Sequence, residues 1–66
     1  MNQSINVVGM TCQHCVNSVT EELSKIKGVQ KVEVDLNSGN VEISAETKID
    51  QYEISEAIKE AGYELS

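Results

Sequence analysis

The 66-residue sequence contains no proline, no phenylalanine and no tryptophan, and these absences limit what the protein can do. A core without Phe or Trp has to be built from Val, Ile, Leu and Ala, which offer no aromatic surface on which nucleotide bases could stack. Basic side chains are also few: the sequence has five lysines and eleven carboxylates, which give a formal net charge of -6. Phosphate backbones bind basic patches, so we expect no binding to nucleic acid, and the acidic balance favours a basic protein partner.

Long apolar runs are missing as well. No stretch approaches the roughly 20 apolar residues that a membrane-spanning helix needs, so we expect no direct membrane insertion. The opening segment "MNQSINVVGM" lacks the cationic start and the apolar core of a signal peptide. The sequence therefore predicts a cytoplasmic protein, and its length predicts a single domain over residues 1–66. Since cytoplasmic thiols stay reduced, the two cysteines are expected to be metal ligands or reactive thiols rather than a structural disulfide.

Two amphipathic helices are expected from apolar residues that recur at three- and four-residue steps. The two apolar stripes consist of Val16, Val19, Leu23 and Ile26, and of Ile54, Ala57, Ile58 and Ala61. We expect Gly28 to end the first helix, just after two lysines, and Gly62 to end the second. Asp50 with Glu53 three residues later resembles a capping box, which marks the start of the second helix.

Alternating apolar and polar residues predict strands at 29–36 and 41–46, joined by the turn "NSGN". A first strand is expected at 5–8, where β-branched residues gather before Gly9, and "YELS" leaves room for only a stub of a last strand. The order β-α-β-β-α-β, with amphipathic helices and half-polar strands, predicts an α+β ferredoxin-like sandwich. In that fold, an antiparallel sheet carries two helices on one face.

The chemistry of the chain is concentrated in "GMTCQHC", residues 9–15, which holds both cysteines and the only histidine. Cys12 and Cys15 flank the expected start of the first helix, where unpaired N–H groups and the helix dipole favour negative charge. Both thiols should therefore ionise more readily than in a free peptide. Two thiolates three residues apart can converge on one soft or borderline ion, such as Cu(I) or Zn(II).

Three kinds of site compete for this loop. A structural zinc site needs four ligands and would have to recruit His14, a carboxylate or a second molecule. A dithiol-disulfide oxidoreductase needs a thioredoxin-like context and the proline that usually lies opposite its cysteines, whereas this chain has no proline. Cu(I) is satisfied by two thiolates alone, so the sequence favours a metal-binding protein over an enzyme. His14 is either a solvated surface histidine, which is the favoured interpretation, or a neighbour of the metal.

The loop sequence "GMTCQHC" resembles the Gly-Met-Thr-Cys-x-x-Cys signature of the heavy-metal-associated domain family. Further agreement comes from "IKGV" at 26–29, and "EAGY" at 60–63 is similar to the Gly-Tyr loop that faces the metal in bacterial copper chaperones. The resemblance extends over the whole chain. It implies a small cytoplasmic carrier that delivers Cu(I) to the metal-binding domains of a copper-transporting P-type ATPase, or one such domain cut from a pump.

The resemblance also implies a role for each residue of the loop. Cys12 and Cys15 would be the metal ligands, Met10 a buried support beneath them and Thr11 a neighbour that shapes the loop. Tyr63 would lie just outside the ligands, although without the resemblance Met10 could be core filler and Tyr63 a cap of the second helix. Family members specialised for zinc or cadmium often carry an acidic residue near the first cysteine, whereas this chain has Thr11 in that neighbourhood, which favours copper without excluding mercury. We expect a monomer, with a copper-bridged dimer as the alternative.

Overall fold

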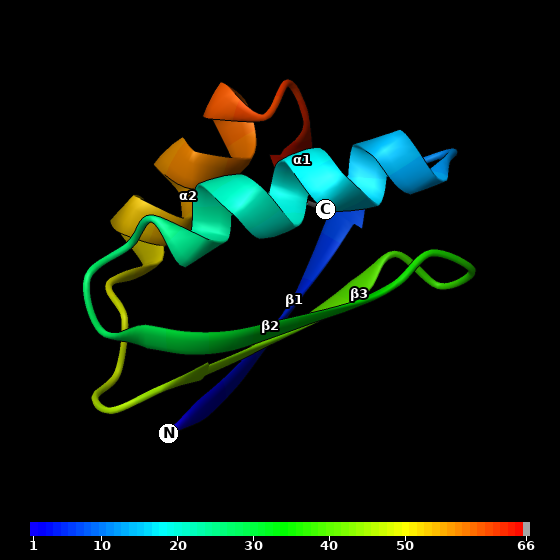
Figure 1. Ribbon diagram of the computed structural model, residues 1–66. Helices are drawn as coiled ribbons and strands as arrows, with labels where there is room; N and C mark the ends of the chain where they lie inside the picture. The colour runs from blue at the N-terminus through cyan, green and yellow to red at the C-terminus, as the bar shows by residue number, and fades with distance from the viewer. Residues whose placement is uncertain (66) are drawn as a thin grey trace.

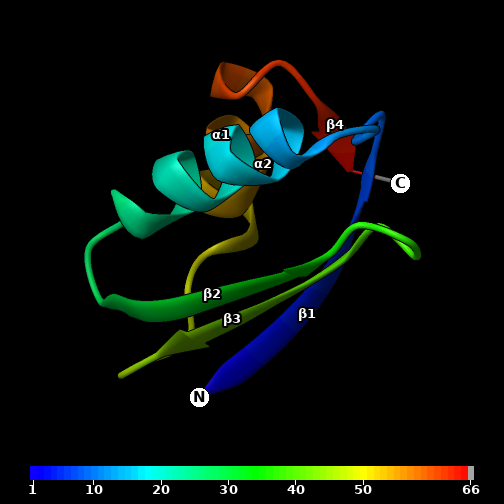
Figure 2. The ribbon, with the colours of Figure 1, turned by 45° about the vertical axis from the view of Figure 1, so that its right-hand side comes forward.

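In the computed structural model, which describes residues 1–65, four strands form one antiparallel sheet and two helices cover one of its faces (Figures 1 and 2). The elements are β1 (Asn2–Val8), α1 (Gln13–Ser24), β2 (Val29–Asp35), β3 (Asn40–Ala45), α2 (Gln51–Glu60) and β4 (Glu64–Leu65). The strands lie in the order β2-β3-β1-β4, and every neighbouring pair is antiparallel. The predicted ferredoxin-like β-α-β-β-α-β sandwich is confirmed, and the expected stub of a last strand is the two-residue β4.

The core lies between the sheet and the helix layer and is entirely apolar. Its eleven buried residues are Val7, Met10, Val19, Leu23, Val41, Ile43, Ala45, Ile49, Ile54, Ala57 and Ile58. Burial of each large aliphatic side chain stabilises the fold by roughly 1.5–3 kcal/mol. Neither cysteine belongs to this buried set, although the partly buried Cys15 packs against it.

The first helix ends earlier than the sequence pattern predicts. We expected Gly28 to end it, whereas α1 stops at Ser24 and Lys25 is its C-cap. The N–H groups of Lys25 and Ile26 donate to carbonyls three residues back, which tightens the last turn before the chain leaves the helix. Ile26 stays half-buried against the core from this turn, so the apolar stripe continues beyond the helix itself.

The second helix has the predicted limits. Its N-cap is Asp50, whose carboxylate accepts the N–H of Tyr52, the second helical residue, at 2.9 Å. The predicted capping box would instead join this carboxylate to the N–H of Glu53, the third helical residue. At the other end, Gly62 has a φ of +92° and donates to the carbonyl of Lys59, while the N–H of Tyr63 donates to the carbonyl of Ile58. These two bonds form a Schellman motif, which fixes the direction of the chain as it leaves α2.

Strand β1 begins three residues before its first apolar signal, because polar residues also pair with β3. Gln3 faces the helix layer, where its side-chain amide donates to the carbonyl of Ile49 and accepts the N–H of the same residue. This double hydrogen bond ties the segment before α2 to the strand. In the part of the chain that the structure describes, no helix is both long and apolar enough to cross a membrane.

Acidic side chains crowd the face of the sheet that the helices leave open. Glu33 on β2 and Glu42 on β3 stand directly opposite each other, and like charges in that position destabilise an antiparallel pair. Lys31 lies 3.2 Å from Glu33 and offsets part of the repulsion, but both side chains are mostly exposed, so the ion pair contributes little. The excess of acidic residues therefore lowers the stability of the pairing between β2 and β3.

Replacing Glu42 by lysine should stabilise the protein, because it exchanges a cross-strand repulsion for an attraction to Glu33. We expect Glu42→Lys to raise the free energy of unfolding by roughly 0.5–1 kcal/mol, measured by urea denaturation. Glu46→Lys makes the same change in net charge at an exposed position after β3 and is the matched control. An equal gain from both variants would attribute the effect to net charge rather than to the facing pair.

Candidate metal centre

The two cysteines lie where the loop after β1 enters α1, at one end of the molecule (Figure 1). Cys12 is the N-cap of α1 and Cys15 lies in its first turn. The carbonyl of Cys12 accepts the N–H groups of Cys15 at 3.1 Å and Val16 at 3.2 Å, which closes this turn and brings the side chains together. Their sulfur atoms are 3.1 Å apart and not bonded as a disulfide. The prediction that the pair flanks the helix start is confirmed.

The two thiols differ in their surroundings. Cys12 is exposed, whereas Cys15 is partly buried and packs against the hydrophobic core. One sulfur is therefore held by the fold, and the other faces solvent at the end of the helix. An ion bound between them would remain accessible from outside, because only one of its ligands is partly enclosed.

Met10 and Thr11 precede the pair and lie on opposite sides of the loop. Met10 is 9% exposed and belongs to the core, so it anchors the loop from below. Thr11 is exposed, and its hydroxyl oxygen lies 4.0 Å from the sulfur of Cys15. The sequence allowed Met10 to be either core filler or a support of the loop. The structure places Met10 in the core, and its support of the cysteine pair stays a prediction.

Tyr63 reaches the site from the other end of the chain. The Schellman motif after α2 directs it toward the loop, and its ring packs over Gly9. Gly9 has a φ of +97°, a conformation that favours glycine, and a Cβ atom added there would make an ordinary contact of 3.4 Å with the ring of Tyr63. The sequence identifies Gly9 only as the end of a strand. The contact between Gly9 and Tyr63 was not predicted, because the two residues are far apart in the sequence.

The thiol of Cys15 is the most strongly perturbed titratable group at the site. Its pKa falls from an ordinary value of 9.0 to about 6, chiefly because the hydroxyl of Tyr63 acts as a hydrogen-bond donor toward the thiolate. The backbone of Thr11 and the side chain of Cys12 lower the pKa further, while partial desolvation opposes them. The same interaction with Cys15 raises the pKa of Tyr63. At neutral pH the site therefore holds a thiolate ready to bind a cation.

No third ligand accompanies the two sulfurs. Across residues 1–65, no three His, Cys, Asp or Glu side chains are grouped so that they could hold a metal ion together. His14 lies between the cysteines in sequence, and its side chain is exposed, in keeping with a solvated surface histidine. A closed four-ligand zinc site cannot be assembled from the described part of this chain alone, whereas two sulfurs suffice for Cu(I).

Comparisons with known proteins agree on one family. Residues 4–64 match the heavy-metal-associated domain. A copper chaperone CopZ from Staphylococcus haemolyticus is 39% identical over 66 residues, which cover 98% of this chain and 97% of the relative. Among solved structures, a CopZ metallochaperone aligns over the full length of both chains with a TM-score of 0.92 and 31% identity. A copper binding domain from the P-type ATPase HMA7 aligns with a TM-score of 0.88 and 32% identity, covering 98% of this chain and 89% of that domain.

Alkylation of Cys15 by iodoacetamide should depend on pH in a way that Tyr63 controls. Because the thiolate is the nucleophile, the rate should rise through a midpoint at about pH 6 and then level off. Tyr63→Phe removes the hydroxyl and should move the midpoint upward, toward the ordinary thiol value, as followed by tandem mass spectrometry of the metal-free protein. Tyr52→Phe, at the exposed start of α2, is the control and should leave the midpoint in place. An unchanged midpoint in Tyr63→Phe would remove Tyr63 as the cause of the shift.

Proposed function

The chain belongs to the heavy-metal-associated domain family, and from this premise we propose that it is a copper chaperone. It binds one Cu(I) ion as cargo through the thiolates of Cys12 and Cys15 and hands it on by thiolate exchange. It is a binding protein and not an enzyme. The receiver is a metal-binding domain of a copper-transporting P-type ATPase, and the whole of residues 1–66 forms the single carrier domain.

The observation that carries this proposal is the pair of sulfurs 3.1 Å apart, which no third His, Cys, Asp or Glu of residues 1–65 joins to form a metal-binding group. A Cu(I) ion held by two thiolates keeps coordination positions free. A thiolate of the receiver can therefore bind before the first bond to the carrier breaks, so that tight binding and fast transfer are compatible. The exposure of Cys12 supports its role as the ligand that is exchanged first, because an incoming sulfur reaches it without displacing the core.

The neighbours of the cysteines support the exchange in different ways. Met10 holds the loop on the core, and Thr11 lines the approach to Cys15. Tyr63 stabilises the thiolate of Cys15, which keeps that ligand deprotonated at neutral pH. His14 is exposed beside the pair and is available to the surface of a partner rather than to the ion.

The receiver we propose is similar to the carrier. The domain of a P-type ATPase that aligns with this chain shares its fold and is described as copper-binding. That likeness also supports a second assignment, in which this chain is itself the metal-binding domain of such a pump. Both assignments use the same two thiolates, so they differ in the direction of transfer and not in the chemistry of the site.

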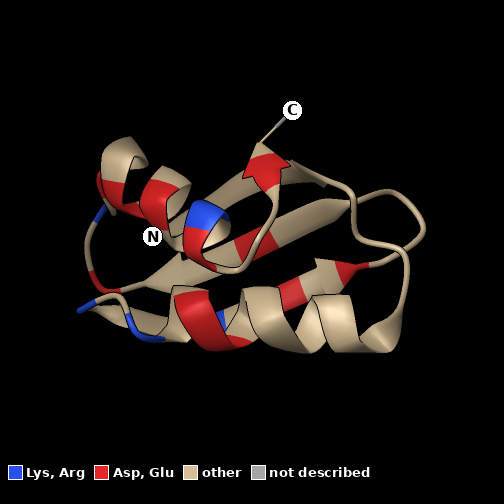
Figure 3. Ribbon diagram, turned by 90° about the horizontal axis from the view of Figure 1, so that it is seen from above, with Lys and Arg blue, Asp and Glu red and all other residues tan. Residues whose placement is uncertain are grey.

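Acidic residues of α1 support the selection of a basic partner, and they lie away from the metal loop (Figure 3). Glu21 is the first charged side chain in the sequence, six residues after Cys15, so it is roughly 9 Å further along the helix axis. Glu22 is paired with Lys25 at 3.0 Å, which weakens its field. These carboxylates therefore act on the approach of a basic partner more than on the final contact around the metal.

Native mass spectrometry under reducing conditions should detect one Cu(I) per chain. Both Cys12→Ser and Cys15→Ser should lose the ion, because a single thiolate cannot hold it against exchange. His14→Ala, which changes an exposed neighbour, should keep it. Retention by either cysteine variant, or loss in His14→Ala, would contradict the two-sulfur site, and a species with two chains would indicate a copper-bridged dimer.

A disulfide-reduction assay on the metal-free protein should show no activity, whereas turnover would favour the oxidoreductase.

Transfer of copper to the receiving domain should depend on ionic strength. If the carboxylates of α1 steer the encounter, the stopped-flow rate falls about tenfold between low and high salt. The pair Glu21→Lys and Glu22→Lys should slow transfer at low salt, while Glu46→Lys with Glu53→Lys, the same charge change away from α1, is the control. A rate that responds to neither salt nor charge reversal would show that the carboxylates of α1 do not steer the encounter.

A further inference from the structure

The turn between β2 and β3 (residues 36–39) lies at the same end of the molecule as the metal loop, which begins at Gly9 (Figures 1 and 2). The turn contacts β1 through its last residue, Gly39. The carbonyl of Gly39 accepts the N–H of Val7 at 2.9 Å, which extends the pairing of β1 with β3 one residue past Asn6 and Asn40. The turn is therefore attached to β1 two residues before the metal loop.

Gly39 approaches β1 more closely than a residue with a side chain could. A Cβ atom built on Gly39 would lie 2.8 Å from the carbonyl oxygen of Val7, and this contact with backbone cannot be relieved by rotating a side chain. Gly39 also has a φ of +76°, which favours glycine independently of the contact. Gly28 has a φ of +95°, but a Cβ atom there would meet only the end of the Ile49 side chain, at 3.8 Å. Gly28 thus shares the backbone conformation of Gly39 without its close contact.

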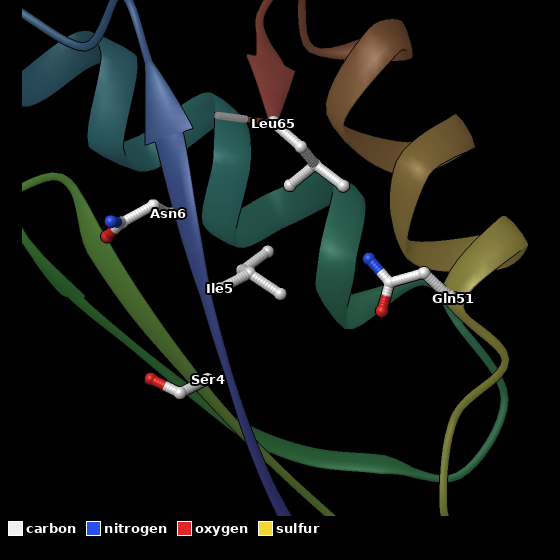
Figure 4. A pocket seen from close by; sticks show the side chains of 5 residues that line it. All are labelled: Ser4, Ile5, Asn6, Gln51 and Leu65. Atoms are coloured by element: carbon white, nitrogen blue, oxygen red, sulfur yellow. The ribbon is translucent and has the colours of Figure 1, made fainter.

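The outer side of β1 supports the end of this strand over a short length in residues 1–65. On that side β4 pairs only with Val7 and Val8. Beyond this pairing, the edge of β1 opens onto a hollow of about 260 Å³, and Figure 4 shows Ile5, Leu65 and Gln51 around it. The contact with the turn on the inner side is therefore an important constraint on the position of Val7.

A displacement of Val7 would reach the first cysteine through a short segment. Only four residues separate Val7 from Cys12, and one of them, Met10, is packed in the core. The segment is therefore too short and too constrained to absorb a shift of the strand. Cys15 does not follow such a shift, because it belongs to α1, which is held by its own buried residues. The contact between Gly39 and Val7 thus affects how Cys12 approaches Cys15.

We propose that Gly39 is a positioning residue of the metal centre. Through its backbone contact with Val7, it sets the direction in which the chain enters the metal loop, and with it the approach of the two thiols to an ion between them. The effect on copper rests on the proposed function. The effect on the approach of the two sulfurs does not, because it is a property of the metal-free chain.

Gly39→Asn tests the contact, and Gly28→Asn is its matched control. Asn adopts a positive φ more readily than most residues, so the two variants carry similar backbone strain and only Gly39→Asn adds the clash with Val7. Competition with a Cu(I) chelator should give a dissociation constant for copper that is roughly fivefold higher in Gly39→Asn and unchanged in Gly28→Asn. Thermal unfolding checks that both variants are folded at the temperature of the titration.

A measurement without copper separates this proposal from the proposed function. In a glutathione buffer, the thiols of Cys12 and Cys15 pass two electrons and two protons to oxidised glutathione, which gives one protein disulfide and two reduced glutathione molecules. The equilibrium constant of this exchange measures how readily the two sulfurs meet. It should fall roughly fivefold in Gly39→Asn and stay constant in Gly28→Asn. Equal changes in both variants, or an unchanged constant in Gly39→Asn, would overturn the proposal even if the chain binds no copper.

A second variant weakens the same contact without adding a side chain, so the test also holds if Gly39→Asn does not fold. Peptides 1–11 and 12–66 can be joined by chemical ligation at Cys12, with the N–H of Val7 replaced by an ester oxygen. The same replacement at Ile5 is the control, because alternate residues of β1 turn their N–H groups toward β3. The Val7 ester should shift the glutathione equilibrium in the direction of Gly39→Asn, and the Ile5 ester should leave it in place. The same value for both esters would refute the role of Gly39.

Discussion

The separation of the two cysteine sulfurs depends on where α1 begins, and the core determines that point. Val19 and Leu23, both fully buried, fix the rotation of the helix against the sheet. Met10 fixes the loop that leads into it. Because both ends of the loop are fixed by packing, the first turn of α1 brings Cys12 and Cys15 close together. The distance between the two sulfurs is therefore set by core packing and not by a bound metal.

A second constraint comes from the C-terminal part of the described chain. The Schellman motif after α2 directs Tyr63 over Gly9, and β4 pairs with β1 immediately before the same loop. The segments that flank the site thus belong to the first and last strands, which are neighbours in the sheet. This closure gives Cys15 its hydroxyl neighbour and explains why an aromatic residue far away in sequence determines the protonation of a thiol.

Much of this arrangement could be predicted from the sequence, because local signals specify it. Apolar periodicity, the cap at Asp50 and the glycine at 62 are each read within a few residues, and they define the order of the elements. The end of α1 was predicted wrongly, since Ile26 continues the apolar stripe through a turn that is no longer helical. The contact of Gly9 with Tyr63 and the opposition of Glu33 and Glu42 depend on tertiary pairing, which no local pattern records.

The position of Tyr63 gives the protein an optical label at its metal loop. The chain contains two tyrosines and no tryptophan, so all of its intrinsic near-ultraviolet emission comes from these two rings. One of them lies against the loop beside Cys15, while Tyr52 is 69% exposed at the start of α2 and takes no part in the site. The emission of Tyr63 should change when an ion binds between the sulfurs, whereas the emission of Tyr52 serves as an internal reference. Occupancy of the loop can thus be followed in the unmodified chain, without a dye or a competing chelator.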